Sequence, residues 1–132
     1  MKPLRAFFAA VSLLVATPAF AQVPPSAAEA AAYTGLHAAA QRGDTAAIER
    51  LLRGASDRRP LLEARDGHGR TPLHVATFAR QREAVKALLA AGADSAAFED
   101  GRYDAVTIAA VADDEETLRV LLAAGASAKL TT

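Results

Sequence analysis

Three side chains suited to proton transfer or metal binding fall in turn-rich stretches of the chain. Asp66 and His68 are two residues apart, and Asp100 lies in a second such stretch. A carboxylate beside an imidazole can move a proton or help to hold a metal ion. Two ligand-type side chains on a loop fall short of a metal site, however. An exposed loop is therefore the first interpretation of His68, and a site around Asp66, His68 and Asp100, enzymatic or accessory to an enzyme, is the alternative.

The established catalytic motifs are missing from the whole sequence. It has no cysteine, no Gly-x-Ser-x-Gly elbow, no phosphate-binding glycine loop and no His-Glu-x-x-His pair. The sequence thus predicts no catalytic residue, no resident metal and no cofactor, and it favours a protein that is not an enzyme.

Four consecutive acids, residues 113–116, form a run that could in principle attract Ca²⁺. They lack the spaced oxygen ligands of a dedicated calcium loop. The run falls where a helix is expected to begin, and acids there cap the helix and complement its dipole. The alternative is an acidic end that recognises a basic partner or docks head-to-tail on another copy, as in a self-assembling protein.

The elements that carry these residues follow from an internal repeat. Gly92-Ala93 recurs as Gly125-Ala126, 33 residues later, and Leu88-Leu89 recurs as Leu121-Leu122 at the same interval. A fixed period of this length marks a protein of stacked repeats. Such stacks present extended surfaces instead of pockets, which moves the expected function from chemistry towards binding.

A third copy lies upstream. Thr34-Gly35-Leu36-His37 precedes Thr71-Pro72-Leu73-His74 by 37 residues, so four residues must be inserted between the first two copies. The proline and charges of residues 56–60 suit a solvated turn better than a helix. We expect repeat units at 29–64, with the insertion near 53–60, at 65–98 and, in degenerate form, at 99–132.

These motifs together resemble the ankyrin repeat, and the resemblance covers nearly all of the chain after residue 26. Residues 66–76, with Thr71-Pro72-Leu73-His74, are the closest match, whereas Gly35 replaces the preferred proline in the first copy. The resemblance implies an all-α solenoid of three stacked helix-turn-helix repeats with short β-hairpin-like fingers. It also implies that His37 and His74 bond backbone and neighbouring repeats. The tetratricopeptide repeat is the rival, but it lacks this motif.

The residues of the second copy predict the same helices independently. Thr71 can cap a helix whose first position is Pro72 and which runs to about Ala79. A second helix over 82–90 would place its apolar residues on one face, and Gly92 would end it in a left-handed conformation. No copy can bury its apolar face alone, so the three must stack along a continuous seam that includes Leu52, Leu89 and Leu122.

The first twenty-one residues have the layout of a secretory signal peptide. Lys2 and Arg5 precede an apolar run, and Ala19-Phe20-Ala21 is a small-x-small cleavage site. We expect cleavage after Ala21, a leader at 22–28, and a periplasmic or secreted location without stable membrane insertion. An uncleaved anchor is the alternative. The pattern Ser26-x-x-Glu29 predicts a capping box that opens an N-terminal helix.

Charge excludes one class of partner. The sequence holds 15 basic and 15 acidic residues, and removal of residues 1–21 would take away two basic ones, leaving a net charge near −2. A near-neutral domain of this kind does not resemble a nucleic-acid binder. We expect a monomer that binds another protein, as a scaffold, protector or inhibitor.

The aromatic residues of the expected mature chain all fall outside the repeated apolar skeleton. In ankyrin-like stacks such positions, on fingers and inner helices, are exposed and touch partners, and aromatic and arginine side chains dominate binding energetics. For each of the two phenylalanines, packing between neighbouring fingers and helices is the alternative. We hypothesise one recognition face, with these partner-binding residues: Tyr33, His68, Arg70, Phe78, Phe98 and Tyr103.

Overall fold

The computed structural model describes residues 22–126 of the chain. The predicted signal peptide and the last six residues of the third unit lie outside the described residues. The described part contains helices and no strand, as the ankyrin-like interpretation predicts. The helices are α2 (Ala27–Ala32), α3 (Gly35–Arg42), α4 (Thr45–Arg53), α5 (Arg59–Leu62), α6 (Pro72–Phe78), α7 (Arg82–Ala90), α8 (Ala105–Val111) and α9 (Glu115–Ala123).

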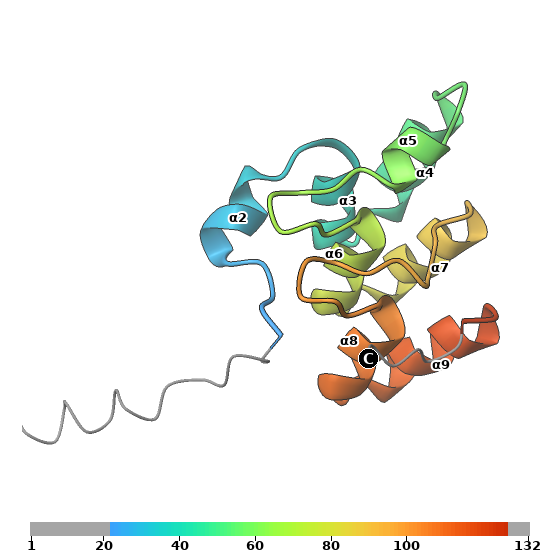
Figure 1. Ribbon diagram of the computed structural model, residues 1–132. Coiled ribbons are helices and arrows are strands. Elements are labelled where there is room, and N and C mark those ends of the chain that lie inside the picture. The colour runs from blue at the N-terminus through green and yellow to red at the C-terminus, as the bar shows by residue number, and fades with distance from the viewer. Residues whose placement is uncertain (1–21, 127–132) are drawn as a thin grey trace, which may run out of the picture.

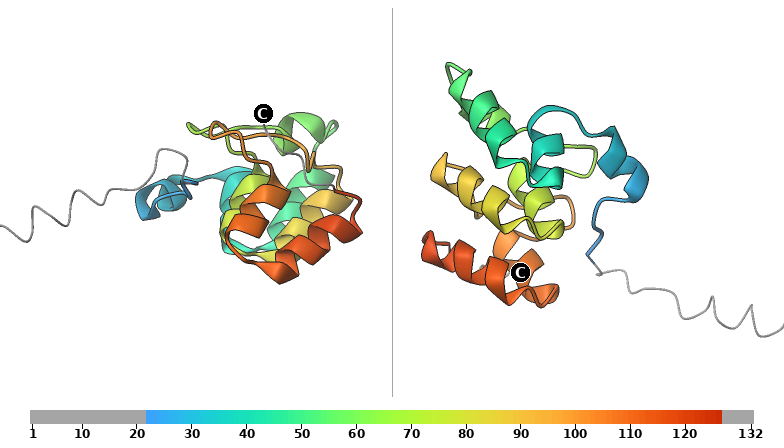
Figure 2. Two further views of the ribbon diagram at one scale, coloured as in Figure 1. Left: turned by 60° about the horizontal axis from the view of Figure 1, so that its bottom comes forward. Right: turned by 180° about the vertical axis from the view of Figure 1, so that it is seen from behind.

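Three antiparallel helix pairs stack in chain order: α3 with α4, α6 with α7, and α8 with α9 (Figure 1). The inner row consists of α3, α6 and α8, and the outer row of α4, α7 and α9, each helix packing on its neighbour in the row. The predicted all-α stack of three helix-turn-helix units is therefore confirmed. Helix α2 stands apart from both rows, beside the loops that join the pairs (Figure 2).

The second unit shows why these residues form these helices. Thr71 has extended backbone and caps α6, its Oγ1 accepting from the N–H of His74 while the Nδ1 of His74 accepts from the N–H of Thr71. Pro72 follows at the first helical position, where its missing N–H costs nothing. Helix α7 has the predicted bounds, and Gly92 follows it with a φ of 106°, a conformation that side chains disfavour.

One apolar core runs through all three units. Leu36, Leu73 and Val106 occupy equivalent buried positions of the inner helices, and the alanines three residues later are buried as well. Coverage of the outer seam falls along the stack: Leu52 is 4% exposed, Leu89 is half-buried and Leu122 is 48% exposed. Each unit is covered by the unit that follows it, and within residues 22–126 no unit follows the third, so Leu122 is the most exposed of the three leucines.

The inserted segment differs from its prediction. Residues 56–60 were expected to form a solvated turn, but Arg59 and Pro60 open the single-turn helix α5. Proline is tolerated in the first turn of a helix, and this turn buries Leu62 in the main core. Burial of that leucine offsets the poor helix propensity of the segment.

Both predicted acidic caps are present. Ser26 and Glu29 form a reciprocal capping box at the start of α2. In the acidic run, Asp114 caps α9 by accepting from Thr117, and the two glutamates lie in the first turn. Burial opposes ionisation of Asp114, but hydrogen bonds from Thr117 and Arg82 outweigh it and lower its pKa. The helix-capping interpretation of this run is confirmed.

Within residues 22–126, no helix has the length and apolar composition needed to cross a membrane.

Candidate recognition face

Two long loops project beside the inner helices and form the fingers of the stack: the first finger, residues 63–71, and the second, residues 93–104 (Figure 1). Backbone hydrogen bonds close each finger on itself, including those from Asp66 N–H to the Arg70 carbonyl and from Glu99 N–H to the Tyr103 carbonyl. The fingers are also joined to each other, because Asp100 N–H donates to the His68 carbonyl at 3.0 Å. The two fingers therefore present one hydrogen-bonded surface.

The two repeated histidines fasten the fingers to the helices behind them. His37 Nε2 donates to the Arg70 carbonyl, and His74 Nε2 donates to the Ala97 carbonyl, both at 2.8 Å. Burial lowers the pKa of His74, although the bond to Ala97 opposes this effect. Its neutral ring accepts at Nδ1 and donates at Nε2, so one side chain joins a helix cap to the next finger. The structural use of these histidines is confirmed.

Arg70 lies at the centre of the first finger, and its expected exposure is wrong. Its side chain is 1% exposed. Nη1 donates to Asp66 at 3.0 Å, Nη2 donates to the Val23 carbonyl at 2.8 Å, and the guanidinium carbon lies 5.9 Å from the centre of the Phe78 ring. A buried guanidinium needs such partners, since an unpaired buried charge is costly. The sequence did not reveal that residues far upstream would cover it.

Asp66 fixes this arginine and is itself fixed by four donors. The hydroxyl of Tyr33 donates to it at 2.5 Å, and the backbone N–H groups of His68 and Arg70 donate at 2.8 Å each, beside the Arg70 guanidinium. Burial opposes ionisation of Asp66, but these bonds outweigh it and lower its pKa to about 2. Burial and the bond to Asp66 raise the pKa of Tyr33 to about 12. The pair is thus an ionised acceptor held by a neutral phenol.

A cavity of about 220 Å³ opens between the finger tips and the chain before α2. His68, Arg70 and Tyr103 line it, together with Gln22, Val23, Glu99, Asp100 and Gly101. The imidazole of His68 is half exposed, and its Nδ1 lies 3.1 Å from a carboxylate oxygen of Glu29. The cavity is small, which suits a short segment of polypeptide better than a bulky ligand.

The structure brings five of the six predicted residues into one neighbourhood. Tyr33 and Phe78 contact the Asp66–Arg70 pair, while His68 and Tyr103 join Arg70 around the cavity. Phe98 lies outside this group on the second finger, 37% exposed, with its carbonyl accepting from Arg65. Phe78 is half-buried beneath Arg70 and is therefore closer to a packing role than an open contact. Whether these residues bind a partner stays a prediction.

The alternative site around Asp66, His68 and Asp100 does not form a catalytic group. Asp66 is engaged by four donors, and His68 faces Glu29 instead of Asp66. No cluster of three or more potential metal ligands occurs in residues 22–126. Glu29 and Val23 are the contributors that the sequence did not reveal: the capping box predicted a helix start there, but nothing local indicates where that helix docks.

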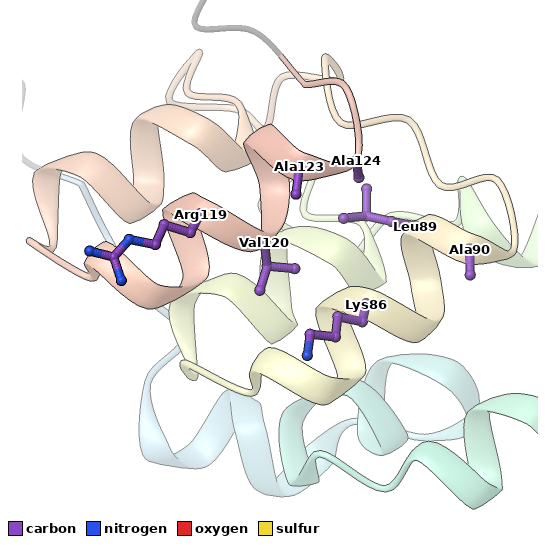
Figure 3. Close-up of a pocket in the computed structure, with 7 residues that line it drawn as sticks. All are labelled: Lys86, Leu89, Ala90, Arg119, Val120, Ala123 and Ala124. Carbon is purple, nitrogen blue, oxygen red and sulfur yellow. The ribbon is translucent and has the colours of Figure 1, made fainter.

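A second hollow lies on the outer helices, away from the fingers (Figure 3). It has a volume of about 470 Å³ and is lined mainly by apolar side chains of α7 and α9, including Leu89 and Val120. Its two basic side chains are already paired within their own helices, Lys86 with Glu83 and Arg119 with Glu115. This groove continues the poorly covered seam of the last unit.

Comparison with known proteins agrees with the architecture. A family model described as ankyrin repeats (3 copies) matches residues 8–99 and 36–132. Inversin from Mus musculus is 37% identical over 87 residues, which is 66% of this chain and 8% of that protein. Inversins from Gallus gallus and Homo sapiens are 35% and 36% identical over similar lengths. The chain therefore spans only a small part of the relatives it matches. Since the family matches cover most of its length, the chain belongs to the ankyrin-repeat family, whose repeats are protein-interaction modules.

Proposed function

We propose that this chain is an exported, non-enzymatic module that binds another protein through its finger surface, as a scaffold, protector or inhibitor. The observation that carries the proposal is that hydrogen bonds hold the two fingers to the helices and to each other. His37 and His74 hold them to the helices, and the bond between Asp100 and His68 holds them to each other. A surface that is already ordered loses little conformational entropy on binding, so more of its contact energy appears as affinity.

The side chains on this surface support protein as the ligand. Phe98 and the imidazole of His68 are exposed on adjacent fingers, and Tyr103 lies half-buried on the second finger, beside the cavity. Aromatic side chains of this kind anchor protein interfaces because they bury a large area with few rotatable bonds. We propose no nucleic-acid ligand, because the net charge is near zero.

The proposed location rests on the sequence of residues 1–21. A basic start, an apolar run and a small-x-small site support export with cleavage after Ala21. The partner would then be a periplasmic or secreted protein, bound by a monomer. Amino-terminal sequencing of the exported protein would test this: a mature chain that begins at Gln22 is expected, and a chain that keeps residues 1–21 would contradict it.

Capture of the partner tests the proposed function. Immobilised protein would be exposed to a periplasmic extract, and retained proteins identified by mass spectrometry. Phe98→Ala should reduce retention of a specific partner about tenfold, the loss of one good anchor. Val111→Ala truncates another exposed apolar side chain, at the end of α8 and away from the fingers, and as the control it should not reduce retention. Equal retention by the Phe98 variant and the wild type would overturn the finger surface as the binding face.

A further inference from the structure

Residues 22–29 of the chain lie across its own finger surface. The Val23 carbonyl accepts from Arg70 Nη2 at 2.8 Å, and the Gln22 amide donates to the Thr107 carbonyl at 3.4 Å. Glu29 then places one carboxylate oxygen 3.1 Å from His68 Nδ1 and the other 3.6 Å from Arg70 Nη1. The segment therefore makes the contacts of a bound peptide: a main-chain carbonyl and, six residues later, a carboxylate.

The receiving side is assembled without this segment. Asp66 orients the guanidinium, Phe78 lies beneath it, and Tyr33 orients Asp66. Arg70 Nε has no acceptor, so the buried cation still has hydrogen-bonding capacity. The acceptor of Nη2 is the Val23 carbonyl, so a segment that displaces residues 22–29 must supply a carbonyl or a carboxylate in its place.

The acids of the second finger do not reverse this preference. The Glu99 carboxylate accepts from the backbone N–H groups of Gly101 and Tyr103, at 2.9 and 3.1 Å, and is thus occupied by its own turn. The Asp100 carboxylate lies at the edge of the cavity, against Gly69. Because Gly69 has no side chain, there is room for the carboxylate. The guanidinium of Arg70 and the imidazole of His68 line the cavity or its rim and contact Val23 and Glu29 of the segment.

The resident segment is held by few contacts. Val23 is 61% exposed, and α2 buries none of its residues. The capping box that keeps α2 helical is local, and it adds nothing to the core. Segments with little buried apolar area and exposed hydrogen bonds open at low free-energy cost. Residues 22–32 can therefore leave the site while the stack stays folded.

We propose that the cavity around Arg70 and His68 binds an acidic peptide segment of the partner, and that residues 22–32 are a resident competitor for the same site. This deepens the proposed function and rests on it. A partner segment must offer a main-chain carbonyl to Arg70 and a carboxylate to His68 and Arg70. Its apparent affinity is reduced by the fraction of time for which residues 22–32 occupy Arg70 and His68.

The probe is a fluorescent, end-capped peptide with the sequence of residues 22–32, added to the full chain and followed by anisotropy. Ser26→Ala/Glu29→Ala removes the capping box and the carboxylate of the resident segment. If that segment occupies Arg70 and His68 about nine-tenths of the time, the variant should bind the probe about tenfold more tightly than the wild type. Glu49→Ala/Ser56→Ala changes the same residue types at exposed positions elsewhere and should bind like the wild type.

Two further measurements locate the probe. In the Ser26→Ala/Glu29→Ala background, His68→Ala should weaken binding about fivefold, because it removes one carboxylate contact without entering the core. A probe with glutamine in place of its glutamate should lose a similar factor. His68→Ala is preferred to any change of Arg70, which could disturb the finger itself, and circular dichroism would confirm that each variant is folded.

Equal probe affinity for the wild type and the Ser26→Ala/Glu29→Ala variant would overturn the competition. Absence of probe binding to that variant at millimolar concentration, or binding indifferent to His68, would overturn the site. These outcomes differ from failure of the proposed function, which is read from retention of cellular proteins and its dependence on Phe98. If the probe binds as expected but no cellular protein is retained, the peptide site is supported and the proposed binding of a partner protein is contradicted.

Discussion

The second and third units are built on the same skeleton, yet equivalent positions have different surroundings. Leu88 and Leu121 are both fully buried, but Leu89 is half-buried and Leu122 is 48% exposed. His74 joins its helix to the second finger, while the equivalent Thr107 has no following finger among the described residues and its carbonyl accepts from Gln22. The second unit is covered on both sides, and the third, in the described residues, on one.

This difference explains where the repeat motif is kept. A side chain that contacts the following unit needs a specific shape, because it must fill a defined space or reach a defined carbonyl. The same position in the third unit has no following unit to contact within residues 22–126, and threonine stands there where the second unit has histidine. The sequence of the third unit is therefore degenerate on the side that faces away from the stack, whereas its inward face keeps Val106, Ala109 and Leu121.

The largest expected effect is a difference in stability loss between a leucine buried between units, Leu88, and a half-exposed leucine of the third unit, Leu122. Leu88→Ala removes a fully buried side chain from between units and should lower the free energy of unfolding by about 3 kcal/mol. Leu122→Ala makes the same chemical change at a half-exposed position and should cost less than about 1 kcal/mol. Urea denaturation of both variants would measure the difference. A similar loss at both positions would mean that something covers Leu122 in solution.

The next effect isolates the histidine that joins two units. His74→Ala removes the hydrogen bonds to Thr71 and Ala97 and should cost about 2 kcal/mol, because the Ala97 carbonyl loses its partner. Thr107→Ala, the matched change in the third unit, should cost less than about 0.5 kcal/mol. Hydrogen exchange should also speed up in the second finger of the His74 variant alone. Unchanged protection of residues 97–103 in that variant would contradict the fastening role.

Local chemistry accounts for what the sequence predicted well. The capping residues Thr71 and Ser26, the proline after Thr71 and the glycine after α7 act within a few residues of themselves, so their effects can be foreseen from spacing alone. The apolar period likewise predicted α7 at its observed bounds. The stack followed from the repeat, since each unit needs a neighbour to bury its face.

The candidate site was predicted less well because its geometry depends on distant contacts. The Arg70 guanidinium donates to the carbonyl of Val23, which is 47 residues upstream and belongs to a segment without any repeat pattern. Tyr33 orients Asp66 across 33 residues, and no local signal reveals that bond. The helix α5 was missed because burial of Leu62, a tertiary effect, outweighed local preferences for a turn. The residue types that matter could be named, but not which of them would face solvent.

The smallest expected effect concerns pH and again contrasts the two units. Burial lowers the pKa of His74 below its ordinary 6.5, so between the two values the unfolded chain binds a proton that the folded chain does not. The stability that His74 contributes is thus complete above pH 6.5 and declines as the pH falls through the lowered value, by at most about 1.4 kcal/mol per pH unit. Thr107 cannot titrate, so the equivalent position of the third unit adds no such dependence.

Comparison of wild type with His74→Gln between pH 7.5 and 5 would isolate this contribution, since glutamine can donate to Ala97 without titrating. The free energy of unfolding of the wild type should fall more steeply below pH 6.5 than that of the variant, while the two slopes coincide above it. The contributions of all other titrating groups to the two slopes are the same, so they cancel in the difference. If the two plots of unfolding free energy against pH are parallel over the whole range, the His74 ring can be protonated without loss of stability. That result would contradict the conclusion that a neutral His74 ring links α6 to the second finger.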